Sequence, residues 1–290
     1  MSFVIVTDSS ANLTDALIDQ YDIRVLSLRF YVSGREYDSY IKGKSPDYQQ
    51  FYTMMRNKEN ITTTLINPDL CSQVFREILD AGDDLLYIGF SSALSGTYQA
   101  GHMVLEQIKK DYPDRKIYDV DTLGASLGEG LLVYHAALLR EQGQSIDQVY
   151  QWLMDNRLHL CHWFTVDDLF FLKRGGRVSA TTAVVGTLLK VKPVMHMDNA
   201  GRLIPVDKVM GRRKSLDALV ERMERTAIDP ANQQVFISHG DCLQDAQYVA
   251  DRIKQRMGVK KDILIHYVEP VIGAHSGPGT VALFFLGTQR

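Results

Sequence analysis

The sequence predicts an α/β fold in two domains, with parallel-rich sheets flanked by helices. Short apolar runs of strand length alternate along the chain with longer segments of helical periodicity. In the first half the order is strand and then helix, which is typical of parallel βα units. The chain has 290 residues, which is enough for two domains at roughly 100–200 residues each.

Residues 1–157 form the predicted N-terminal domain. Its expected strands are apolar runs bounded by polar residues, at Phe3–Val6, Ile23–Leu28, Leu85–Phe90 and Lys116–Val120. Ser33-Gly34 is typical of a hairpin turn between Phe30–Val32 and Tyr37–Tyr40. Ser45-Pro46 and Asn67-Pro68 each combine a capping side chain with a proline suited to the first helical turn. Further helices are expected at Thr14–Tyr21, from Thr97 to about Lys110, at Gly124–Arg140 and at Ser145–Asn156.

Residues 158–290 form the predicted C-terminal domain, and a change in pattern near residue 157 marks the boundary. Its expected strands are Leu158–Val166, Val194–Met197, Leu203–Val209, Gln234–His239, Ile263–Val268 and Val281–Leu286. Its expected helices are Asp167–Leu172, Ala180–Lys190, Arg212–Arg225 and Leu243–Met257. Gly273–Gly279 contains three glycines and a proline, which favours a turn before the last strand.

Composition excludes several classes of protein. Apolar residues make up 45% and charged residues 23% of the chain, which is typical of a globular protein rather than a disordered one. The net charge of −3 lacks the basic excess of a nucleic-acid-binding protein. The three cysteines, Cys71, Cys161 and Cys242, lie far apart, and we expect buried thiols rather than a zinc site or disulfides. We see neither a secretory signal nor an apolar run of about 20 residues, so we expect a cytoplasmic protein without integral membrane association.

Polar segments follow three of the predicted strands, where open α/β sheets bind their ligands. These segments are Thr7-Asp8-Ser9-Ser10, Ser91–Thr97 and Gly273–Gly279. Ser95-Gly96-Thr97 leads directly into a helix, where free backbone N–H groups and the helix dipole favour an anion. Helix capping accounts for one hydroxyl in this segment but less easily for the others. The sequence therefore predicts a hydroxyl-rich anion site. Thr62-Thr63-Thr64 could add donors without adding charge, although this segment taken alone is better explained as a β-branched strand end.

From the residues alone, several functions remain open. Asp8, Ser91 or Ser95, and His275 are the residue types of a hydrolase triad, although a lone histidine is more often structural. A small-molecule hydrolase or phosphoryl-transfer enzyme using Ser95 and His275 is one alternative. A nucleotide-binding regulatory module, with phosphate held by the glycine-rich turn, is another. We expect the acidic pairs Asp83-Asp84 and Asp167-Asp168 to cap helices or face solvent rather than bind a metal, and no cofactor is expected.

Seven sequence blocks along the chain occur together in one order, namely Thr7–Ser10, Ser91–Ala100, Asp121–Leu132, Asp167–Leu169, Leu172–Ser179, Lys192-Pro193 and Gly273–Gly279. By these blocks, which span nearly the whole chain, the sequence resembles the DegV family, the fatty-acid-binding proteins that serve a bacterial fatty acid kinase. The chain departs from the family at Thr63-Thr64-Leu65-Ile66-Asn67, where the family often has Thr-Ser-Gln-Pro-Ser.

This resemblance implies a long-chain fatty acid held between two α/β domains. By motif match its carboxylate would be bound by Thr63, Ser95, the backbone of Gly96 and His275. Arg174, in the basic turn Lys173-Arg174-Gly175-Gly176-Arg177, would help to dock an ATP-binding fatty acid kinase subunit. That subunit phosphorylates the bound carboxylate to an acyl phosphate for phospholipid synthesis, so the chain itself is expected to have no catalytic residue.

Overall fold

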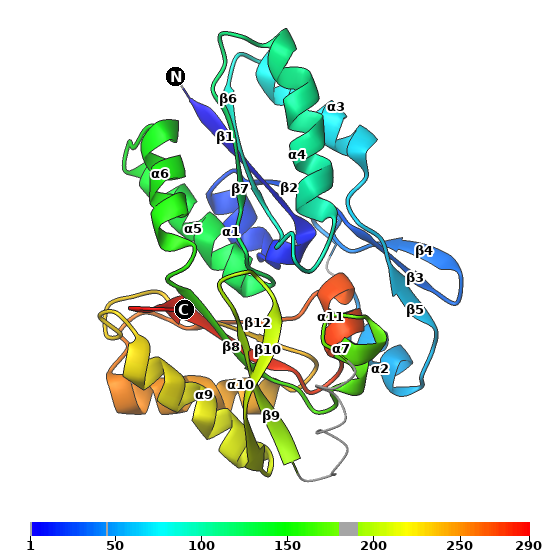
Figure 1. Cartoon of the computed structure of the whole chain (residues 1–290), viewed down its shortest axis with the longest axis vertical. Coiled ribbons are helices and arrows are strands. Elements are labelled where there is room, and N and C mark those ends of the chain that lie inside the picture. Colours follow the sequence, from blue (N-terminus) through cyan, green and yellow to red (C-terminus); the bar gives the residue numbers. More distant parts are fainter. Residues whose placement is uncertain (1, 45, 180–190) are drawn as a thin grey trace.

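The computed structural model describes residues 2–44, 46–179 and 191–290, and these residues form three sheets (Figure 1). The helix predicted at Ala180–Lys190 lies outside the described residues, as does Ser45. The α/β class predicted from the sequence is confirmed, with a parallel sheet, two sheets that contain antiparallel pairs, and helices packed on them.

The first sheet has four strands in the order β2-β1-β6-β7, and all its neighbours are parallel, as the strand-then-helix order predicted. Its strands are β1 (Phe3–Asp8), β2 (Arg24–Leu26), β6 (Asp84–Gly89) and β7 (Ile117–Asp121). Figure 1 shows α3 (Pro68–Asp80) and α4 (Thr97–Ile108) on one face, with α5 (Leu127–Glu141) and α6 (Ile146–Asn156) on the other. The short helix α1 (Asp15–Gln20) follows β1 after a single 3-10 turn, Ser9–Ala11.

The second sheet has six strands in the order β10-β9-β8-β13-β11-β12. They are β8 (Leu160–Thr165), β9 (Val191–Met197), β10 (Leu203–Met210), β11 (Phe236–His239), β12 (Leu264–Tyr267) and β13 (Val281–Leu286). Only β11 and β12 pair in parallel, and α10 (Leu243–Met257) connects them as the predicted βαβ unit. Helices α9 (Arg212–Thr226) and α10 bury their apolar residues against this sheet.

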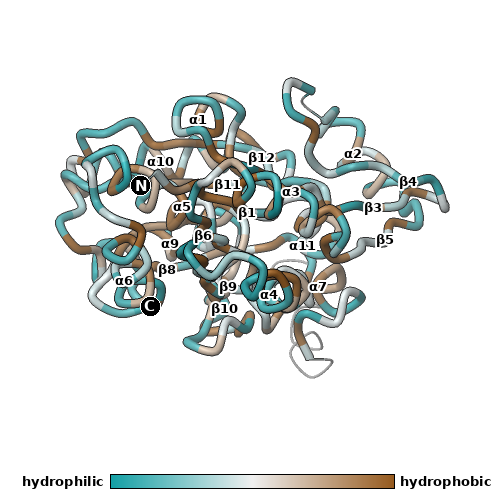
Figure 2. The backbone as a smooth tube through the Cα atoms, turned by 90° about the horizontal axis from the view of Figure 1, so that it is seen from above, coloured by the Kyte–Doolittle hydropathy of each residue, from teal (hydrophilic) through white to brown (hydrophobic). Residues whose placement is uncertain are grey.

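Helix α5 joins the two larger sheets into one continuous core. Its buried residues, such as Leu131 and Leu132, share a cluster with Ile5 and Leu86 of the first sheet and with Phe284 of the second. Figure 2 shows the apolar backbone segments gathered around α5, β1 and β11 in the middle of the molecule. The predicted boundary between residues 157 and 158 stays a prediction.

The third sheet is small and collects segments from distant parts of the chain. Strands β3 (Arg29–Val32) and β4 (Arg35–Asp38) form the predicted hairpin, and β5 (Ile61–Thr63) pairs with β3. Around this sheet lie α2 (Tyr48–Arg56), α7 (Phe170–Arg174) and α11 (Pro270–Ser276). Phe30, Phe51, Tyr52, Val271 and Ala274 form its buried cluster.

Two local predictions need correction. Helix α2 begins at Tyr48, later than Ser45-Pro46 predicted. Its capping residue is Asp47, whose carboxylate accepts the backbone N–H of Gln50. Gly273–Gly279 is a turn only in its last part, since α11 extends to Ser276. Helix α11 begins at Pro270, and the carboxylate of Glu269 caps it by accepting the backbone N–H groups of Val271 and Ile272. With its N-terminus stabilised in this way, the helix continues through Gly273.

Candidate ligand-binding site

A cavity of about 280 Å³ is lined by segments that belong to, or directly follow, strands of all three sheets. Its size is close to the lower end of the roughly 300–1,000 Å³ that small-molecule sites occupy. Most of its wall is apolar and consists of Phe90, Leu94, Phe164, Leu172, Met197, Leu203, Val268, Val271, Ile272, Ala282 and Phe284. Such a wall suits a hydrocarbon ligand.

The four residues predicted to bind a carboxylate, Thr63, Ser95, Gly96 and His275, all line this cavity. Thr63 is the last residue of β5, and its register opposite Phe30 of β3 places it at the edge of the third sheet. His275 lies in the last turn of α11. The Oγ1 of Thr63 is 2.8 Å from the Nε2 of His275, so these two groups form one polar cluster.

His275 is a neutral hydrogen-bonding group at neutral pH. Burial, with smaller contributions from the charges of Arg177 and Arg174, lowers the pKa of its imidazole to about 4. A neutral imidazole has one N–H donor and one nitrogen acceptor, so it can orient a carboxylate or a hydroxyl without adding charge.

Ser95 and Gly96 stand at the N-terminus of α4. Gly96 is the N-cap residue of this helix and makes no side-chain cap, while the Ser95 hydroxyl accepts the backbone N–H of Thr97 at 3.2 Å. The same hydroxyl lies 2.9 Å from the Oγ1 of Thr97. Capping thus uses Ser95 in part, but its oxygen remains at the cavity wall beside a helix N-terminus that favours an anion.

The basic turn after α7 packs directly beside this cluster. A Cβ atom on Gly175 would overlap the Nδ1 of His275, so only glycine leaves room for the imidazole. Arg177 lines the cavity, and its Nε donates to the carbonyl of Leu94 at 3.2 Å. Arg174 is exposed and does not line the cavity; its guanidinium lies 5.3 Å above the ring of Phe171.

The wall contains residues that sequence reasoning did not select. Arg177 was visible only as one charge in the basic turn. Ser126, Ser238 and Ser276 also line the cavity, as does His162 of β8. Ser126 and Ser276 had a local signal, their places in the blocks Asp121–Leu132 and Gly273–Gly279. Ser238 of β11 and His162 of β8 had none, because they reach the cavity through the pairing of strands distant in sequence.

Leu65, Ile66 and Asn67, where the chain departs from the usual family pattern, have separate roles. Leu65 is exposed and lines the cavity, Ile66 is buried in the cluster with α3 and α4, and Asn67 caps α3. Of these three residues, Leu65 is the one that lines the cavity.

The segment Thr7–Ser10 does not line the cavity. Asp8 is fully buried and accepts the backbone N–H groups of Ser10 at 3.0 Å and Phe90 at 3.1 Å. The Ser10 hydroxyl lies between Asp8 and the buried carboxyl of Glu129, and burial raises the pKa of both carboxyl groups. This network connects β1 to β6 and α5, which is a structural role.

The residues weighed as a hydrolase triad do not form one in the described part of the chain. The polar side-chain partner of His275 is Thr63, and that of the Ser95 hydroxyl is Thr97. The Ser91 hydroxyl donates to the carbonyl of Gly201 at 3.0 Å, and Asp8 is held by the network of Ser10. A triad needs its nucleophile, base and acid in hydrogen-bond sequence, and these contacts do not supply one.

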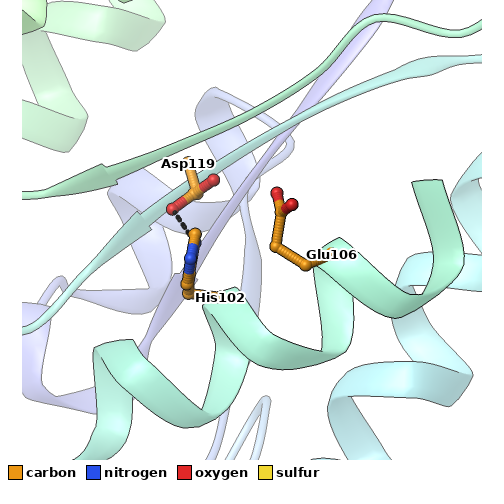
Figure 3. Close-up of side chains that lie close together, drawn as sticks. All are labelled: His102, Glu106 and Asp119. Carbon is orange, nitrogen blue, oxygen red and sulfur yellow. Dashed lines mark hydrogen bonds and ion pairs between the residues drawn. The ribbon is translucent and has the colours of Figure 1, made fainter.

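A separate cluster outside the cavity contains metal-ligand residue types (Figure 3). His102 and Glu106 of α4 point toward Asp119 of β7, with the His102 Nδ1 2.9 Å from the Oδ2 of Asp119. Lys109 is 2.5 Å from a Glu106 oxygen and 4.0 Å from an Asp119 oxygen, and Tyr98 donates its hydroxyl to Asp119. These contacts give each of the three side chains a partner within the chain, so the geometry of the cluster needs no metal to explain it.

The acidic pairs singled out in the sequence also have partners within the chain. Asp84 is buried and accepts the backbone N–H of Lys116, and Asp167 forms an ion pair with Lys192 at 2.9 Å. Among the helices of the described residues, we find none whose length and apolar character would let it span a bilayer.

Comparisons with known proteins match one family over almost the whole chain. Residues 2–288 match the family model described as "Uncharacterised protein, DegV family". The chain is 43% identical to a DegV domain-containing protein of Clostridium perfringens, over 99% of this chain and 98% of that protein.

Solved structures agree as well. One described as "Fatty Acid Binding of a DegV family Protein from Thermus thermophilus" has a TM-score of 0.87 and 28% identity, covering 99% of this chain and 100% of that chain. DegV of Bacillus subtilis, described as a fatty acid binding protein, has a TM-score of 0.84 and 25% identity, covering 99% and 100%. The chain belongs to the DegV family.

Proposed function

We propose that this protein binds a long-chain fatty acid in the cavity and presents its carboxylate to an ATP-binding kinase subunit. The observation that carries the proposal is a single cavity whose wall joins Thr63, Ser95, Gly96 and His275 to a largely apolar lining. The fatty acid binding described for the relatives from Thermus thermophilus and Bacillus subtilis supports it.

The energetics favour a ligand held mainly by its tail. Burying one methylene contributes about 0.8 kcal/mol, so a sixteen-carbon chain offers on the order of 12 kcal/mol before the entropic costs of binding. The polar cluster then needs only to orient the head group, which neutral donors such as the Thr63 hydroxyl and the Gly96 N–H can do.

Neutral head-group contacts also suit presentation to a second protein. A bidentate arginine would hold both carboxylate oxygens, whereas single donors leave one oxygen free to attack the γ-phosphorus of ATP. The bond from that phosphorus to ADP then breaks, ADP leaves, and an acyl phosphate forms. In this proposal the kinase subunit supplies the catalysis and this chain supplies the bound fatty acid. The phosphoryl transfer occurs in the cytoplasm, where ATP is present.

Arg174 is the residue we assign to partner docking. It is exposed beside the cluster, and its guanidinium also reaches the carbonyl of Ala274 on α11 at 3.4 Å. We expect Arg174→Ala to slow acyl phosphate formation with the kinase subunit while leaving fatty acid affinity unchanged. Arg225→Ala, an exposed arginine on α9, is the matched control and should change neither quantity.

Native mass spectrometry of the purified protein, followed by denaturing extraction, tests the binding itself. We expect one bound fatty acid per chain, or uptake of added palmitate or oleate to that stoichiometry. A protein that is empty and takes up neither acid would overturn the proposal. Arg174→Ala with unchanged acyl phosphate formation would overturn only the docking assignment.

A further inference from the structure

The cavity wall contains hydroxyl groups beyond those assigned to the carboxylate. Ser126 and Ser238 face each other in this wall, with their Oγ atoms 3.1 Å apart. Ser276 lines the same cavity. A tunnel built only for a hydrocarbon tail has no use for these groups, because each buried hydroxyl costs free energy unless it is hydrogen-bonded.

The side-chain hydroxyl of Ser276 is unpaired within the described part of the chain. Its side chain is 7% exposed, and among the described residues its Oγ has no hydrogen-bonding partner. Most buried polar side chains in proteins are hydrogen-bonded, so an unpaired hydroxyl at a cavity wall indicates a partner in the cavity.

The Ser126–Ser238 pair is incompletely satisfied. Ser126 is 5% exposed and Ser238 fully buried, and each hydroxyl has the other as its side-chain partner in the described residues. Two hydroxyls carry two hydrogens, and one hydrogen bond between them uses one. The second hydrogen and several lone pairs are left for a group in the cavity.

Ser126 also has an unfavourable backbone. Its φ of 55° and ψ of −148° lie in a region that glycine adopts readily and serine does not. A glycine at position 126 would remove this strain, yet the chain has serine there. Strained residues of this kind cluster at ligand-binding sites, where the side chain has a use.

The pair comes from elements apart from those that carry Thr63. Ser126 precedes α5 and Ser238 lies on β11, whereas Thr63 ends β5. In both views α5 and β5 lie on opposite sides of α11 (Figures 1 and 2). The polar pair and Thr63 therefore come from different elements around one cavity.

We propose that the preferred ligand is a fatty acid with a hydroxyl group along its chain, bound by Ser126 and Ser238 and assisted by Ser276. The inference rests on the proposed fatty acid binding and specifies the ligand of that site. A chain hydroxyl both donates and accepts, which matches the unused hydrogen and lone pairs of the serine hydroxyls. A purely apolar tunnel would instead bind the hydroxy fatty acid more weakly, because the chain hydroxyl would lose its hydrogen bonds to water and gain none in the tunnel.

Dissociation constants for stearate and for a series of hydroxystearates, with the hydroxyl at successive carbons, test the inference. The measurement is displacement of a fluorescent fatty acid from the full chain. We expect at least one isomer to bind as tightly as stearate or more tightly, by up to about tenfold for one added hydrogen bond. The variants Ser126→Gly, Ser238→Ala and Ser276→Ala each remove one serine hydroxyl. They therefore separate the contribution of the hydroxyl contact to affinity from the contribution of the buried hydrocarbon tail.

Ser126→Gly is the most informative variant, because glycine suits the backbone at position 126 and folding should not suffer. At least one of the three variants should weaken the favoured hydroxystearate several-fold while leaving stearate unchanged or tighter. Thr165→Val is the matched control. The Thr165 hydroxyl is buried, has no partner among the residues that the structure describes, and does not line the cavity, so this variant should leave the preference intact.

Two results would overturn the inference while leaving fatty acid binding in place. In the first, every hydroxystearate binds more weakly than stearate. In the second, none of the three serine variants changes the preference between stearate and the favoured hydroxystearate. That is the result expected if a structural water, rather than the ligand, is hydrogen-bonded to the serine hydroxyls. If neither stearate nor any hydroxystearate binds, the proposed function fails together with the inference.

Discussion

The Oγ1 of Thr63 and the Nε2 of His275 lie 2.8 Å apart, although 212 positions separate them in the sequence. This contact joins the end of β5 to α11. It also brings a neutral imidazole and a hydroxyl together at the cavity wall, where Ser95 and Gly96 at the N-terminus of α4 and the guanidinium of Arg177 also lie.

Replacing the Thr63 hydroxyl tests its part in head-group binding. Thr63→Val keeps the β-branched shape but removes the donor, and we expect fatty acid affinity to fall about tenfold, the effect of one hydrogen bond to a charged group. Thr63→Ser keeps the hydroxyl and should retain most of the affinity. Equal dissociation constants for the valine variant and the wild type would show that the carboxylate is bound elsewhere.

Gly175 tests whether the position of His275 matters for binding. Gly175→Ala places a methyl group where the imidazole lies, so we expect weaker fatty acid binding, measured by displacement titration, with the helical content of the circular dichroism spectrum retained. The neighbouring Gly176 has a φ of 72° and open space around it. Gly176→Ala should therefore lower the melting temperature through backbone strain but keep the affinity. If Gly175→Ala kept the affinity and Gly176→Ala lowered it, the packing of Gly175 against His275 would not matter for binding.

Glu269 makes stability depend on pH. Burial outweighs its hydrogen bonds from Ser39 and from the backbone of Ile272 and Val271, and raises its pKa from 4.5 to about 7. Because the folded pKa is raised, the carboxyl's contribution is fully present below the unfolded pKa and is lost as the pH rises through about 7. We expect wild type to lose on the order of 3 kcal/mol relative to Glu269→Gln between pH 4.5 and 8.

Urea unfolding of both proteins across that pH range measures the Glu269 effect. Other titrating groups are common to the two proteins, so their contribution cancels in the difference. Glu221→Gln, an exposed residue on α9, is the control. A constant difference between wild type and Glu269→Gln at all pH values would show that Glu269 keeps an ordinary pKa.

The three cysteines should be inert in the folded protein. Burial is the main cause that raises the pKa of Cys71, Cys161 and Cys242 to about 12, so the reactive thiolate is scarce at pH 8. We expect Ellman's reagent to label none rapidly in buffer and all three in guanidinium chloride. Rapid labelling of Cys242, the least buried of them, would instead indicate local opening around the start of α10.

The sequence on its own determined the local architecture. Strand and helix periodicity predicted the parallel first sheet correctly, and Asn67-Pro68 and Ser95-Gly96-Thr97 predicted where α3 and α4 begin. These features depend on hydrogen bonds and side-chain spacing within a few consecutive residues, which a linear pattern records directly.

Tertiary structure decided which polar groups face the cavity. The motif Thr7–Ser10 is rich in hydroxyl side chains, like the cavity-lining segment near Ser95, yet it forms a buried network with Glu129. Arg177 lines the cavity while Arg174 does not, and Ser126 meets Ser238 across 112 positions. Such choices follow from how helix α5 packs between two sheets, and the burial that sets the pKa of His275 and Glu269 exists only once those layers are assembled.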